Sequence, residues 1–218
     1  MPRLLFEKTG PAVWISHLDL MRLFQRSFKR AGLSLKHSQG YSPRPYVAVA
    51  LPLSVGVESV CELLDFDLEG DPVAEDLIKE RLNQVLTEGI RVLDVYQDAA
   101  KIKHLALLDC VVTLEYDNGV PEGACDAIAE LFRRESLTVE KKGKNGPTQQ
   151  DIIPMIRRIS VTAGEKEITL RALVCCQNPS LNPMQLAAAV RAYLPELAPD
   201  HATSRRIEIY DVNEKLFR

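Results

Sequence analysis

Basic side chains gather near the start of the chain, and their type suits contact with phosphate groups. Residues 1–50 hold eight Lys or Arg and only two acids, although the whole chain has a net charge of −3. Clustered Lys and Arg on one element are the electrostatic footprint of a surface that binds phosphates. The candidate phosphate contacts are Arg22, Arg26, Lys29, Lys36 and Arg44.

Two histidines lie within the same basic stretch and are candidates for acid–base chemistry. His17 falls in the first turn of a predicted helix, where the positive helix end keeps an imidazole neutral. His37 follows in the loop after that helix, from which it could approach His17. The alternative for both is an ordinary surface or packing role, which most histidines in such positions have.

The loop that carries His37 combines hydrogen-bonding side chains with two stiffening prolines. Pro43 and Pro45 favour an extended path, and polar loops held by a scaffold commonly carry function. We expect Gln39 and Tyr41 to contact sugar or base, Tyr41 by stacking.

The helix that positions these residues is predicted from its ends and its period. Ser16 and Asp19 form a capping-box variant that satisfies exposed backbone donors, and Gly32 ends the helix. Apolar residues at spacings of three to four predict one buried face, which leaves the basic residues on another. We expect His17 and Asp19 to order the corner between helix and loop.

Each half of the chain predicts the element order βαββαβ, which is that of a ferredoxin-like domain. In the first half the predicted elements are strand 3–8, helix 16–31, strands 47–53 and 62–69, helix 72–86 capped by Asp71, and strand 90–96. In the second half they are strand 105–116, helix 121–134, strands 137–141 and 166–175, helix 183–194 and strand 205–210.

The sequence therefore predicts an α+β protein of two tandem ferredoxin-like domains. Their predicted bounds are 1–98, with the basic helix and loop, and 103–218. A Lys- and Gly-containing stretch near 141–158 predicts a basic hairpin insertion in the second domain. The alternative is one continuous α+β sheet shared by both halves.

Several classes of site lack their sequence signals. A CxxxCxxC cluster motif, a P-loop and a GxGxxG motif are missing, so we expect no such cofactor on the chain itself. Five cysteines without CxxC pairing indicate neither a zinc ribbon nor a disulfide framework, and we expect no metal. Apolar runs fall far short of the roughly 20 residues that span a bilayer, so we expect a cytoplasmic protein without membrane contact.

Three segments resemble the radical-SAM-associated (radical-SAM-linked) protein family, which has no established biochemical activity. They are FEKTGPAVWISHLDLMRLFQRSFKRAGL, SQGYSPRP and ALPLSVGVES, and DIIPMI near residue 151 fits the family's second half. The resemblance covers most of the chain and is most specific from Ser16 to Arg22. The family commonly has Asn and His where this chain has Ser42 and Arg44. The resemblance implies a radical SAM enzyme as partner, often one with a cobalamin-binding region, and a genetic neighbourhood in ribosome and RNA metabolism.

Three functional hypotheses follow. The first is a non-catalytic RNA-binding accessory protein that presents RNA or a ribonucleoprotein to a radical SAM enzyme on a separate chain. The second is a metal-independent endoribonuclease with His17 or His37 as general base and Arg44 or Lys36 stabilising the transition state. Tandem ferredoxin-like domains with a basic first helix are similar to CRISPR repeat-processing ribonucleases. The third is a protein-binding adaptor whose basic helix docks on an acidic partner surface.

Overall fold

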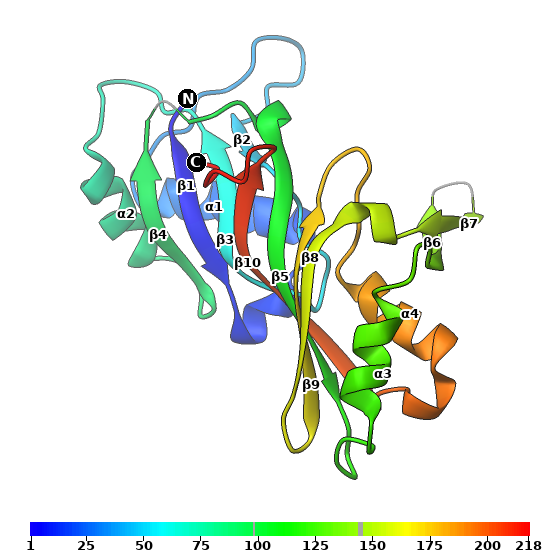
Figure 1. Cartoon of the computed structure of the whole chain (residues 1–218). Coiled ribbons are helices and arrows are strands. Elements are labelled where there is room, and N and C mark those ends of the chain that lie inside the picture. Colours follow the sequence, from blue (N-terminus) through cyan, green and yellow to red (C-terminus); the bar gives the residue numbers. More distant parts are fainter. Residues whose placement is uncertain (98, 144–145) are drawn as a thin grey trace. The chain divides into compact units, whose positions relative to one another are not determined.

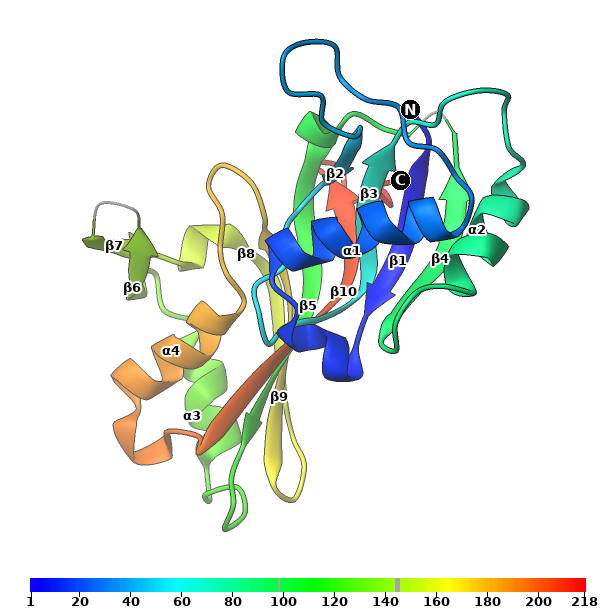
Figure 2. The same cartoon turned by 180° about the vertical axis from the view of Figure 1, so that it is seen from behind.

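The computed structural model describes residues 1–97, 99–143 and 146–218, without the side chain of Lys142. The chain divides into two compact units (Figures 1 and 2). Unit 1 comprises Met1–Ile102 and Arg218, and unit 2 comprises Lys103–Phe217. Each unit combines helices with an antiparallel sheet, which confirms the predicted α+β class.

Unit 1 has a four-stranded antiparallel sheet in the order β4-β1-β3-β2. Its elements are β1 (Arg3–Lys8), a 3₁₀ turn η1 (Gly10–Trp14), α1 (His17–Arg30), β2 (Val47–Val49), β3 (Glu58–Phe66), α2 (Glu75–Asn83) and β4 (Ile90–Tyr96). Figure 2 shows α1 lying across the strands of this sheet. Phe24 of α1 packs edge-on against Phe6 with ring centroids 4.8 Å apart, and Phe28 packs against Phe66 at 5.0 Å. These contacts bury one face of α1 and turn its basic face outward.

Both ends of α1 follow the local rules that predict them. The Asp19 amide donates to Ser16 Oγ at 3.2 Å, so Ser16 caps the first turn. Past the last turn, the Leu33 amide donates to the Phe28 carbonyl at 2.9 Å, and Gly32 has a φ of +68°. That bond and that φ are those of a glycine-terminated helix, so the predicted bounds are confirmed.

The second helix of unit 1 is shorter than the sequence predicts. It begins at Glu75 rather than at Pro72, and neither Asp71 nor Ala74 caps it with a side chain. At its other end the Asn83 side chain accepts from the Val92 amide at 2.8 Å and donates to the Val92 carbonyl at 2.9 Å. This long-range pairing with β4 ends the helix before Leu86, although the local apolar period continues.

Unit 2 has a four-stranded antiparallel sheet in the order β10-β5-β9-β8. Its elements are β5 (Leu105–Glu115), α3 (Ala124–Leu131), β6 (Thr138–Gly143), β7 (Gly146–Asp151), η3 (Ile153–Met155), β8 (Ile156–Ala163), β9 (Glu167–Cys175), α4 (Met184–Tyr193), η4 (Pro195–Leu197) and β10 (His201–Asp211). A further 3₁₀ turn, η2, spans Ile102–His104. The helices pack on one face of the sheet (Figure 1).

The second strand of this sheet is not the one that the sequence predicts. Residues 138–143 form β6, which pairs with β7 in a separate two-stranded hairpin. Residues 156–163, predicted in part to be an exposed insertion, form β8 and pair with β9, Ser160 opposite Arg171. The insertion is therefore the β6–β7 hairpin and ends before residue 156. Lys144, at the predicted basic tip, lies outside the described residues.

Candidate functional site

The exposed face of α1 forms an open groove with a volume of about 760 Å³. All of its lining residues belong to the helix: Asp19, Arg22, Leu23, Arg26, Lys29 and Arg30. Four of the predicted binding residues therefore lie together, at spacings of three and four along one helix face. An α-helix rises about 1.5 Å per residue, so Arg22 and Lys29 mark out about 10 Å of this groove.

The charges of this groove are unequally compensated. Arg22 forms an exposed ion pair with Asp19 at 3.1 Å. The pKa of Asp19 is lowered, chiefly by the hydrogen bond from Ser16 and then by Arg22. Within the described part of the chain, Arg26 and Lys29 have no carboxylate at ion-pair distance. These two side chains supply positive charge that no carboxylate among the described residues neutralises, and no hydrogen bond to the fold holds them.

Arg30 lines the same groove but is tied to the fold. Its Nη2 donates to the carbonyl of Val85 at 2.6 Å, just beyond the end of α2, and to Ser27 Oγ at 3.4 Å. The guanidinium therefore joins the C-terminal ends of the two helices of unit 1. The basic residues therefore lie on the same helix face but do not all have the same role.

The loop between α1 and β2 is a hairpin-like projection (Figure 2). Ser38 donates its amide to the Arg44 carbonyl at 2.9 Å, and Tyr46 donates its amide to the Lys36 carbonyl at 2.8 Å. Tyr41 is fully exposed in the segment between these pairs. The hydrogen-bonded stem holds Tyr41 out from the sheet, as a stacking residue requires.

A second groove of about 580 Å³ lies beside the C-terminal half of α1, and Lys29 lines both grooves. The second groove is lined by Gln25, Lys29, Gly32, Leu33, Ser34, Leu35, His37, Pro45 and Glu69. Lys29 therefore connects the basic face of α1 with the base of the loop. Among the other predicted residues, Gln39 and Arg44 are exposed in the loop and line neither groove. Lys36 forms an ion pair with Asp67 at 3.3 Å.

The two histidines do not come together. His17 is the first residue of α1, whereas His37 lines a groove with Gln25 and Lys29. Gln25 lies about 12 Å further along the axis of α1 than His17. His17 Nδ1 is buried and has no hydrogen-bond partner among the described residues. A general base is normally oriented through its second nitrogen, and His17 lacks that support.

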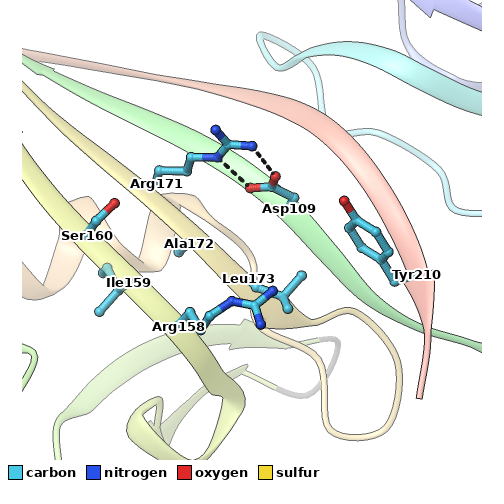
Figure 3. A pocket seen from close by; sticks show the side chains of 8 residues that line it. All are labelled: Asp109, Arg158, Ile159, Ser160, Arg171, Ala172, Leu173 and Tyr210. Carbon is cyan, nitrogen blue, oxygen red and sulfur yellow. Dashed lines mark hydrogen bonds and ion pairs between the residues drawn. The ribbon is translucent and has the colours of Figure 1, made fainter. Parts of the chain in front are cut away.

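A third groove, of about 590 Å³, lies on the sheet of unit 2 and was not predicted from the sequence (Figure 3). Arg171 there pairs with Asp109 through contacts of 2.7 and 3.3 Å, and Arg158 pairs with Glu214. Tyr210 lines the same groove, and burial and then Asp109 raise the pKa of its phenol. In the sheet Arg158 lies opposite Leu173, two residues along β9 from Arg171, and both arginines have acidic partners.

The described part of the chain offers no metal site. No group of three or more His, Cys, Asp or Glu side chains among those residues could hold a metal ion. All five cysteines are free, with Cys61, Cys110 and Cys176 buried. Burial raises the pKa of the Cys110 and Cys176 thiols to about 12. None of the described helices is both long and apolar enough to cross a membrane.

Comparison with known protein families assigns the chain to one family. Residues 2–183 match the family described as "Uncharacterized protein conserved in bacteria (DUF2344)", which is most of the sequence. The chain belongs to this family. Among curated proteins, none matches this DUF2344 chain.

Solved structures are similar to this DUF2344 chain at low sequence identity, and in one of them the similarity extends to the fold. A chain of a Cbf5-Nop10-Gar1 complex has a TM-score of 0.52 and 12% identity over 95% of this chain. An archaeal box H/ACA sRNP Nop10-Cbf5 complex gives 0.46 and 11% over 94%, and an unknown protein from Galdieria sulphuraria gives 0.27 and 10% over 94%. The DUF2344 chain spans 48%, 46% and 96% of those chains respectively.

Proposed function

We propose that this DUF2344 protein is a non-catalytic RNA-binding accessory protein that presents an RNA or ribonucleoprotein to a radical SAM enzyme. The observation that supports RNA binding is the open groove on α1, in which Arg26 and Lys29 have no acidic partner among the described residues. Uncompensated cations on an exposed face release counterions from a phosphate backbone on binding. Arg22 can add a third contact by exchanging Asp19 for a phosphate.

RNA is favoured over a small anion because cationic and aromatic contacts extend beyond one groove. Lys29 leads from the α1 groove to the groove beside the loop, and the loop carries the exposed Tyr41. A backbone can follow the cations while its bases stack on aromatic rings, which is how single strands are commonly bound. A small anion would contact only one part of this surface.

The same proposal includes a more specific description of the fold, as two ferredoxin-like units. In unit 1 the first strand, β1, pairs with both β3 and β4. In unit 2 the first strand, β5, pairs in the same way with both β9 and β10. This antiparallel order and the βαββαβ element order support two ferredoxin-like units, the second with the β6–β7 hairpin inserted. Such a fold is used by proteins of many functions and carries no activity by itself.

The radical SAM partner rests on the sequence resemblance from Ser16 to Arg22. In this proposal the DUF2344 chain supplies substrate binding and the partner supplies the radical chemistry. The partner is tested by co-purification after nuclease treatment, with the full chain as bait and a radical SAM enzyme from the same organism as prey. Recovery of that enzyme supports the assignment, and its absence both with and without RNA removes the partner from the proposal.

RNA binding is tested with fluorescently labelled RNA and matched DNA across a salt series. We expect Arg26→Glu with Lys29→Glu to weaken RNA binding and to reduce the slope of log affinity against log salt by about 0.7 for each lost phosphate contact. Lys166→Glu is the matched control, because Lys166 is an exposed lysine of unit 2 outside the three grooves. Equal affinity and slope in wild type and the double variant would overturn RNA binding by α1.

A further inference from the structure

Trp14 is the only tryptophan of the chain, and 72% of it is exposed. It ends the 3₁₀ turn η1, two residues before the Ser16 cap of α1. Leu18 and Arg22 follow at intervals of four residues, and both are exposed. The exposed side chains around the start of α1 therefore include an indole, an aliphatic side chain and the first arginine of the basic groove.

The backbone beside Trp14 is firmly held although the ring is exposed. The carbonyl oxygen of Val13 accepts two hydrogen bonds of 2.9 Å, one from Lys8 Nζ and one from the Gly56 amide. Lys8 and Val13 are both buried, and the Ile15 amide donates to the Ala12 carbonyl at 3.0 Å. An exposed aromatic residue on a fixed backbone loses little conformational freedom when a ligand binds.

One edge of the indole lies close to Gly56. A Cβ atom placed on Gly56 would lie 3.5 Å from Cζ3 and 3.9 Å from Cη2 of Trp14. Gly56 has a φ of +83°, so its backbone can pass under the ring in a conformation that other residues rarely adopt. The ring edge thus lies near the 54–57 turn, while most of the indole surface stays open.

We infer that Trp14 is a stacking platform for an unpaired nucleobase at the N-terminal end of the α1 groove. This inference rests on the proposed RNA binding and specifies its substrate class as single-stranded RNA. A base within a duplex already stacks on its neighbours, whereas an unpaired base can stack on an aromatic side chain. The α1 groove that follows Trp14 along the chain carries Arg22, Arg26 and Lys29, and this positive charge favours a polyanion over an apolar protein segment.

The test uses Trp14 as its own reporter, since emission from a single tryptophan reports one site. The full chain is titrated with a single-stranded oligoribonucleotide of mixed sequence and with the duplex of the same sequence. We expect the single strand to quench Trp14 emission and to bind more tightly than the duplex. Trp14→Ala should weaken single-strand binding about 5- to 150-fold, the range for loss of one stacked base.

Two variants distinguish stacking from a general loss of exposed apolar surface. Trp14→Phe keeps a ring and should retain part of the affinity, while Val212→Ala removes a similarly exposed apolar side chain of unit 2 and should leave it unchanged. Thermal melting confirms that each variant is folded. Unchanged emission with RNA bound, and full affinity in Trp14→Ala, overturn the platform but leave RNA binding by α1 intact.

Two further outcomes would also overturn the inference. Absence of RNA binding by the wild-type chain overturns the proposed function and the platform with it. If Trp14→Ala abolishes co-purification with the nuclease-treated radical SAM enzyme and leaves RNA affinity unchanged, Trp14 is a protein contact, and the inference is wrong.

Discussion

Lys8 Nζ donates a hydrogen bond of 2.9 Å to the carbonyl oxygen of Val13, and the lysine is only 1% exposed. The ammonium group also interacts electrostatically with the equally buried Glu62. Burial lowers the pKa of Lys8, and Glu62 opposes this effect. A lysine is rarely buried without such partners, because removing its charge from water is costly. Here it joins the end of β1 to the turn that presents Trp14.

We expect Lys8→Met to lower the free energy of unfolding by about 3 kcal/mol, because it leaves the Glu62 charge buried without this cation. Urea denaturation followed by circular dichroism measures the loss. Lys8→Met with Glu62→Leu should be more stable than the single variant, since no buried charge remains. A single variant as stable as wild type would show that Glu62 does not depend on Lys8.

Arg26 and Arg30 should differ in what their loss affects. Arg30→Ala removes the hydrogen bond to Val85 and should reduce the free energy of unfolding by about 1 kcal/mol. Arg26→Ala should change it by less than about 0.5 kcal/mol. For RNA binding the larger effect should come from Arg26→Ala. This variant alone should reduce the slope of log affinity against log salt by about 0.7. Paired urea and salt titrations of the two variants measure this, and equal effects on both quantities would refute the division of roles.

Tyr41 should matter for binding and not for folding. Its side chain is fully exposed, so Tyr41→Ala should leave the melting temperature of the chain unchanged. We expect a loss of at least about fivefold in single-stranded RNA affinity, because one stacked base is lost. Fluorescence anisotropy provides the measurement, with Tyr41→Phe as the variant that keeps the ring. Similar affinities for the Ala and Phe variants would exclude stacking on Tyr41.

Cys110 and Cys176 should resist alkylation in the folded chain at neutral pH, because burial raises the pKa of each thiol to about 12. Mass spectrometry after iodoacetamide treatment measures this, and the same reaction in urea should label all five cysteines. Rapid labelling of either thiol without urea would contradict its burial.

The same thiols predict a dependence of stability on pH. The folded state binds the thiol proton more tightly than the unfolded state, in which the pKa lies near its ordinary value of 9. Their contribution to stability is therefore complete below about pH 9 and is lost as the pH rises toward about 12. Urea denaturation at pH 7 and pH 10 should show a fall that is smaller in Cys110→Ala.

Elements with strong local signals were predictable from the sequence, and those that depend on pairing were not. The bounds of α1 follow from Ser16 and Gly32, whose effects extend over one turn. Strand β8 was missed because its alternating polar residues resemble an exposed loop until Ser160 lies opposite Arg171. A strand is stabilised by partners distant in sequence, so its own residues specify it weakly.

The sequence by itself determined that α1 has one apolar and one basic face, because the helical period alone separates those residues. Only the tertiary structure decided which basic side chains are held by the fold and which can reach a ligand, since the partner of Arg30 is a carbonyl 55 residues away. It also decided that Trp14 is exposed on a fixed backbone, through contacts from Lys8 and Gly56. Such contacts are set by the packing of the whole unit, which no local pattern records.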